Sequence, residues 1–125
     1  MGMTKEQRVI KKIMKETIAN MESLGIYREE FTATIKAYAQ LRYLYDLLNE
    51  RFAEGGFLVT ESYTNKAGAT NIRKTAEYMA LETLRKDILT HETVLGLNPT
   101  GLKKIRADTK PKKESKLEAA LSGLQ

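Results

Sequence analysis

Apolar side chains recur every seven residues across residues 27–54, the longest regular pattern in the chain. One position of the repeat is occupied by Phe31, Tyr38, Tyr45 and Phe52, and the position three residues later by Thr34, Leu41 and Leu48. This a/d-like seam predicts one long helix that packs lengthwise against other helices. Leu44 and Leu47 lie beside the seam, so the apolar arc is wider than one partner helix needs.

Two interpretations of this helix stay open. It is either an ordinary core helix of a small bundle, or a helix with one side buried in its own subunit and another side against a neighbouring copy. On the second interpretation the oligomer interface comprises the seam residues Phe31, Tyr38, Leu41, Tyr45, Leu48 and Phe52.

A second amphipathic pattern lies near the N-terminus. The run Thr4-Lys5-Glu6-Gln7 fits a capping box and opens a helix that continues to about Leu24, where Gly25 ends it. Its apolar face comprises Ile10, Ile13, Met14, Thr17, Met21 and Leu24. Five cations lie nearly opposite, within an arc of about 120°; they are Lys5, Arg8, Lys11, Lys12 and Lys15. This stripe could follow a phosphate backbone, or it could be the solvated side of a surface helix.

The second half of the chain predicts two more helices. The third is expected from Thr70 or Asn71 to Leu95, with an inward stripe of Ala76, Ala80, Leu84, Ile88, His91 and Leu95. Gly96 ends this helix, and Asn98 with Pro99 opens a short fourth helix to about Arg106. The fourth helix turns Leu102 and Ile105 inward, and Lys103, Lys104 and Arg106 outward.

The predicted fold class is therefore all-α. We expect an antiparallel helical hairpin or small bundle with three main helices and a short fourth. Residues 57–63 form a possible short β segment, too short to make a sheet alone, and residues 64–70 form a polar turn. A flexible C-terminal tail follows the last helix.

Charge divides the chain into two parts. The net charge is +5, and residues 103–116 hold seven basic and two acidic groups, a difference that accounts for the whole excess. Such a stretch is typical of polyanion binding, and also of a solvated tail. We assign residues 1–106 to a helical DNA-binding and oligomerisation domain, and residues 107–125 to a basic linker with a partner-docking peptide. The docking side chains are Leu117, Ala120, Leu121 and Leu124, with a frayed terminus as the alternative.

The residues offer no catalytic or metal-binding constellation. The chain has no cysteine and one histidine, so we expect no disulfide, no metal site and no cofactor. His91-Glu92 begins like a zinc-protease motif, but Leu95 stands where the second ligand would be. No apolar run approaches the roughly 18 residues that span a bilayer. We therefore expect a soluble, intracellular protein that is not an enzyme.

Part of the chain resembles a known family. The segment from Asn65-Lys66-Ala67-Gly68 to Leu95-Gly96-Leu97-Asn98-Pro99-Thr100 resembles the phage terminase small subunit, in the group with a Leu-Gly-Leu-x-Pro signature. The resemblance runs from about residue 38 to residue 105, and its most specific part is the signature itself. The family often has a proline soon after the Gly68 turn, where this chain has Thr70-Asn71-Ile72.

The resemblance implies a non-catalytic component of viral DNA packaging in the host cytoplasm. Such subunits form rings of about eight to ten copies, bind double-stranded viral DNA, and deliver it to a large ATPase–nuclease subunit that they modulate. We expect the DNA contacts to come from Lys5, Arg8, Lys11, Lys12 and Lys15, with help from Lys103, Lys104 and Arg106. The alternative is a small helical DNA-binding transcriptional regulator that acts as a dimer, and a third option is a purely structural assembly protein.

Overall fold

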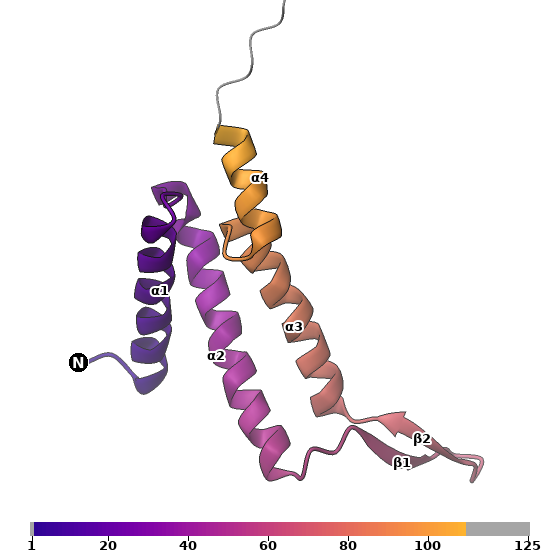
Figure 1. Ribbon diagram of the computed structural model, residues 1–125. Coiled ribbons are helices and arrows are strands. Elements are labelled where there is room, and N and C mark those ends of the chain that lie inside the picture. Colours follow the sequence, from indigo (N-terminus) through magenta and orange to yellow (C-terminus); the bar gives the residue numbers. More distant parts are fainter. Residues whose placement is uncertain (1, 110–125) are drawn as a thin grey trace, which may run out of the picture.

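The computed structural model describes residues 2–109, which are mostly helical (Figure 1). In chain order the elements are α1 (Lys5–Ser23), a 3₁₀ turn η1 (Glu29–Phe31), α2 (Thr32–Glu54), β1 (Thr60–Thr64), β2 (Thr70–Lys74), α3 (Ala76–Leu95) and α4 (Pro99–Thr109). α2 packs on both α1 and α3, and α4 packs on α3. The predicted docking residues Leu117, Ala120, Leu121 and Leu124 lie outside the described residues. The predicted domain boundary after residue 106 falls inside α4.

α1 confirms the prediction made from its sequence. The Gln7 N–H donates to Thr4 Oγ1 at 3.2 Å, and the Thr4 N–H donates to Gln7 Oε1 at 2.9 Å. These two bonds complete the capping box and satisfy backbone donors at the first turn. Thr17 and Met21 are buried on the predicted apolar face, so the opposite face of α1 is turned to solvent.

α2 begins later than predicted. Residues 27–28 are not helical, and the α-helix starts at Thr32 after the short turn η1. The chain must reverse direction between α1 and α2, and Ile26 turns back into the core with an exposed fraction of 6%. The apolar repeat therefore begins in residues 27–31, which close the turn between α1 and α2 and do not belong to the α-helix.

One apolar core joins all four helices at one end of the molecule. Met21 of α1, Ile35 of α2 and Leu95 of α3 are fully buried there. Leu102 and Ile105 of α4 pack against this cluster, as predicted. α1 and α4 each pack one face into this core, so the cations on their opposite faces are turned to solvent.

The junction of α3 and α4 is a close contact between backbones. Gly96 has φ +73, a left-handed conformation that favours glycine, and a Cβ there would lie 2.7 Å from Ile105 Cδ1. A Cβ on Gly101 would overlap the Thr93 carbonyl group. Asn98 fastens the junction, since its Oδ1 accepts from the Gly101 N–H and its Nδ2 donates to Thr93 Oγ1, each at 2.8 Å. The segment 95–101 thus fixes how α4 leaves α3.

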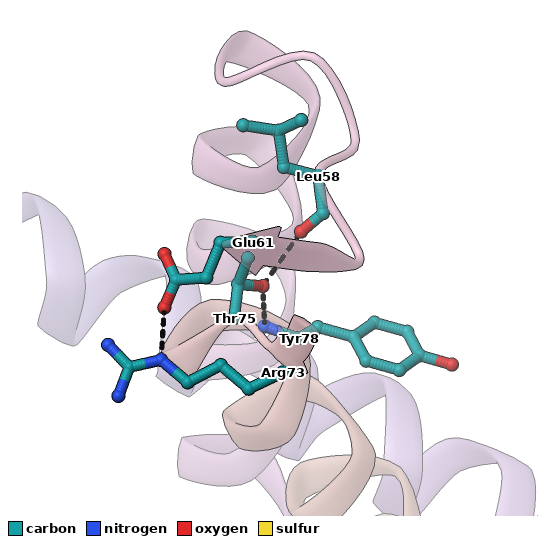
Figure 2. Close-up of polar contacts among 5 residues, drawn as sticks. All are labelled: Leu58, Glu61, Arg73, Thr75 and Tyr78. Atoms are coloured by element: carbon teal, nitrogen blue, oxygen red, sulfur yellow. Dashed lines mark hydrogen bonds and ion pairs between the residues drawn. The ribbon is translucent and has the colours of Figure 1, made fainter. Parts of the chain in front are cut away.

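The fold is largely helical but not all-α, because residues 60–74 form a β-hairpin. The possible β segment predicted at residues 57–63 is confirmed in part by β1, whereas the helix expected from Thr70 or Asn71 is wrong for β2. β1 and β2 form an antiparallel hairpin in which Ser62 lies opposite Ile72. The segment expected to open the third helix is therefore a strand, and α3 begins at Ala76. Thr75 marks the change: its Oγ1 accepts from the Tyr78 N–H at 3.2 Å and donates to the Leu58 carbonyl at 2.7 Å (Figure 2). These bonds cap α3 and tie the hairpin to it.

The inward stripe of α3 also differs from the prediction. Leu81 is fully buried, whereas Ala80 is exposed. Ile88 and Leu95 do contact the core. The predicted stripe holds in the C-terminal half of α3, where Leu84, Ile88 and His91 are half-buried and Leu95 is buried, and fails in the first turns, where Ala76 and Ala80 are exposed.

We predict that Gly101→Ala lowers the free energy of unfolding by about 2 kcal/mol or more, because the new Cβ overlaps the Thr93 carbonyl group. Urea unfolding followed by helical circular dichroism measures this change. Gly55→Ala is the matched control: Gly55 has φ −79, and its Cβ would meet Arg51 O at an ordinary 3.4 Å. The control should stay within about 1 kcal/mol of the parent. Equal stability of the two variants would contradict the close contact.

Candidate nucleic-acid and assembly surfaces

The predicted cation stripe of α1 is fully on the surface. Its members Lys5, Arg8, Lys11, Lys12 and Lys15 are all exposed. Arg8 Nη2 donates to the Met3 carbonyl at 3.3 Å, and none of the five cations forms an ion pair within residues 2–109. A row of unneutralised cations on one helix face can contact successive phosphates.

The cations of α4 form a separate group. Lys103, Lys104 and Arg106 are exposed on a helix that packs at the core, beside the C-terminal end of α1. The α1 stripe occupies the first three turns, toward the opposite end of a helix that is about 28 Å long (Figure 1). The structure therefore does not bring the two predicted sets into one patch within a single copy.

An apolar groove runs along one flank of the α2–α3 pair. It has a volume of about 430 Å³, and its lining is mostly apolar, with one cation and one hydroxyl. The lining residues are Leu44, Leu47, Leu48 and Arg51 of α2, and Ala80, Thr83 and Leu84 of α3. Leu44 is 48% exposed. Apolar surface of this kind on a single copy is a candidate contact for another protein surface.

Most of the predicted interface residues serve the chain's own packing. Tyr38 and Phe52 are buried, with exposed fractions of 3% and 7%, so a neighbouring copy cannot reach them in this conformation. Phe31 packs against the core, Leu41 is half-buried, and the Tyr45 hydroxyl accepts from Arg85 Nε at 3.1 Å. Of the predicted set, Leu48 alone lines the groove. The predicted interface did not include Leu44 and Leu47, which line the groove. Their position beside the seam, in an apolar arc wider than one partner helix needs, could have identified them.

A polar network links α2 to α3 next to the core. The Tyr38 hydroxyl donates to Glu92 Oε2 at 3.3 Å and accepts from Arg42 Nη1 at 3.0 Å. Burial raises the pKa of Tyr38, and the neighbouring Arg42 guanidinium opposes that rise. The same hydrogen bond raises the pKa of Arg42. The network keeps three polar groups satisfied at the helix interface, which is a structural role.

Residues 2–109 offer few other groups that could form a catalytic or metal-binding site. His91 is half-buried, and its Nδ1 lies 2.7 Å from the Asp87 carbonyl oxygen, to which it donates. Within residues 2–109 no three His, Cys, Asp or Glu side chains gather in a way that could hold a metal ion. No helix in that part of the chain is both long and apolar enough to cross a bilayer.

Comparison with known proteins identifies the class. The family model described as phage terminase, small subunit, matches residues 11–112, and the chain therefore belongs to that family. Neither the curated proteins nor the solved structures yielded a match. Small subunits of phage terminases are generally not catalytic, and membership implies association with viral DNA and with the large terminase subunit.

We predict that Tyr38→Phe lowers the free energy of unfolding by about 1 kcal/mol, because the Arg42–Tyr38–Glu92 bridge is lost. Urea unfolding measures it, and Tyr43→Phe is the control, since the Tyr43 hydroxyl makes no hydrogen bond within residues 2–109.

A pH series gives a second measurement of the same variant. Folding raises the pKa of Tyr38 above 10.0, so the unfolded chain releases this proton first and stability falls as the pH rises past 10.0. That alkaline fall should be smaller in Tyr38→Phe than in Tyr43→Phe. An unchanged fall in both variants would remove Tyr38 from the network.

Proposed function

We propose that this small subunit assembles into a closed ring, binds double-stranded viral DNA, and delivers it to the large subunit in the host cytoplasm. The family match over residues 11–112 carries the proposal. The exposed cations of α1 and the apolar groove between α2 and α3 support it, because they supply one surface for phosphate and another for a neighbouring copy. Weak DNA sites repeated around a ring add together.

The α1 stripe is the proposed main DNA contact, and Lys103, Lys104 and Arg106 of α4 are a second, separate one. Contacts to phosphate from lysine and arginine are independent of base sequence and weaken as salt rises. The predicted docking of Leu117, Ala120, Leu121 and Leu124 on the large subunit remains a proposal from the sequence.

We predict that neutralising Arg8, Lys11 and Lys15 to glutamine weakens binding to duplex DNA, because three exposed phosphate contacts are removed. The slope of log K against log salt should become shallower by up to about 3 units, at about 0.9 per contact. Fluorescence anisotropy over a salt series measures both quantities.

The control for this experiment removes the same charge elsewhere. Arg28, Lys66 and Lys86 are exposed just before η1, on the hairpin turn and on α3, away from the first three turns of α1. Their joint change to glutamine should leave most of the slope in place. If the two triple variants lose equal affinity, net charge alone explains binding and the α1 stripe is no DNA site.

We predict that Leu44→Glu shifts the assembled protein toward smaller species, because a carboxylate then lies in the apolar groove. Light scattering over a dilution series measures the mass. Leu89→Glu is the matched control, since Leu89 is 59% exposed and lies on the other flank of the same helix pair.

Two results would contradict this assembly surface. One is equal assembly of both leucine variants, which would place the contact away from the groove. The other is a parent protein that stays a monomer, or a dimer with tight binding to one DNA sequence, which would favour the regulator instead of a ring.

A further inference from the structure

Two clefts flank α1 on nearly opposite sides. One lies between α1 and the first half of α2 and has a volume of about 580 Å³. The other has a volume of about 430 Å³ and lies where α1, α2 and the end of α3 meet. At about 100° per residue, residues 7, 11 and 14 of the first cleft lie about 150° around α1 from residues 13, 16 and 20 of the second.

The charges lining the two clefts differ. The first cleft, which we call the basic groove, has Lys11 of α1 on one wall and Lys36 of α2 on the other, and no acidic side chain among the described residues lines it. The second cleft contains two carboxylates, those of Glu16 and Glu92, and one guanidinium, that of Arg42. A phosphate approaching the α1–α2 pair is therefore attracted to the side of the basic groove.

Lys36 extends the cation stripe of α1 onto a second helix. It is exposed, and neither Lys36 nor Lys11 forms an ion pair within residues 2–109. The axes of packed helices lie about 8–10 Å apart, and lysine has a flexible four-carbon stem. The two ammonium groups can therefore reach the same strand of DNA. Arg8 and Lys15 lie about one turn before and after Lys11, so the groove is continuous with the rest of the stripe.

Two amide side chains of the basic groove supply hydrogen-bond donors. Gln7 Oε1 accepts from the Thr4 N–H at 2.9 Å in the capping box, so the Nε2 group of Gln7 is left to donate elsewhere. Gln40 is exposed, and its side chain makes no hydrogen bond in the part of the chain that the structure describes. Glutamine side chains commonly donate to phosphate oxygens. Both helices thus offer donors to one anionic strand.

The floor of the basic groove is apolar. Ile10 and Met14 of α1 line it and are half-buried. The carbon atoms of a deoxyribose can contact this surface while the adjacent phosphates meet the lysines on the walls. A short acidic peptide in the groove would leave Arg8 and Lys15 without partners, whereas evenly spaced phosphates can also reach these two cations. Charge and continuity with the stripe therefore favour duplex DNA over a peptide.

We propose that the DNA backbone lies along the basic groove and that Lys36 of α2 is a further phosphate contact. Gln7 and Gln40 donate to the same strand. This inference rests on the DNA binding proposed above, and it extends the site from a row on one helix to a groove between two. Because phosphate contacts carry no base information, the groove positions the duplex without selecting its sequence.

The first test removes the charge of Lys36. At about 0.1 M salt, Lys36→Gln should weaken binding to duplex DNA about fivefold, and the slope of log K against log salt should become shallower by about 0.9. Lys86→Gln is the matched control on α3 and should change the affinity less than about twofold. Lys36→Arg keeps the charge and should bind like the parent. Fluorescence anisotropy over a salt series measures all three variants.

The second test introduces the same charge on two sides of α2. Gln40→Glu places a carboxylate in the basic groove and should weaken DNA binding about tenfold. Asn49→Asp is the control, since Asn49 is exposed on the opposite side of the same helix at about 100° per residue, and its affinity should stay within about twofold of the parent. Both variants should keep the helical circular dichroism and the mass of the parent.

The remaining outcomes overturn the inference. If Lys36→Gln matches Lys86→Gln while the triple α1 variant loses affinity, phosphates follow α1 alone and the basic groove is left for a protein partner. If Lys36→Gln or Gln40→Glu lowers the mass of the assembly together with the DNA affinity, the groove is a contact between copies instead. If the parent does not bind duplex DNA, the proposed DNA-binding function fails, and the basic groove fails with it.

Discussion

The rest of the structure depends on a single core at one end of the helices. Met21, Ile35 and Leu95 are fully buried there, with α1 and α4 closing the sides. Beyond this core the second half of α2 packs on α3 and, at Phe52, on the ring of Phe57, before the chain enters the hairpin (Figure 1). One end of the molecule is therefore complete, and the other leaves apolar and main-chain groups without partners. This asymmetry accounts for the groove and for the exposed hairpin together.

Local signals in the sequence sufficed for the elements that are determined locally. The capping box at Thr4 and the helix end at Gly96 each involve groups within a few residues, and both were predicted correctly. The prediction was wrong for β2, because residues 70–72 form a strand only by pairing with residues 62–64. Periodicity along one segment carries no information about that pairing.

The surface sites show the same division. Exposure of the α1 cations followed from their arc opposite the buried face, and the structure agrees. The partner of the α2 seam was harder to predict, because apolar periodicity identifies a buried face but not the surface that covers it. Tyr38 and Phe52 are buried by the chain itself, and the leucines beside the seam are left for the surface. Distinguishing the two required knowing where α3 lies across α2.

The separation of these surfaces bears on how DNA binding and assembly relate. The α1 stripe faces solvent at positions that the apolar groove and the hairpin do not share. Substitutions at one surface can therefore leave the other intact, and on the proposed ring the two surfaces are coupled through the number of joined copies. In an assembly of identical subunits, each short row of cations is repeated at a fixed spacing, so a modest phosphate contact becomes strong only when the copies are joined. On the proposed ring, the incomplete end of the fold therefore determines how strongly the cations of α1 bind DNA.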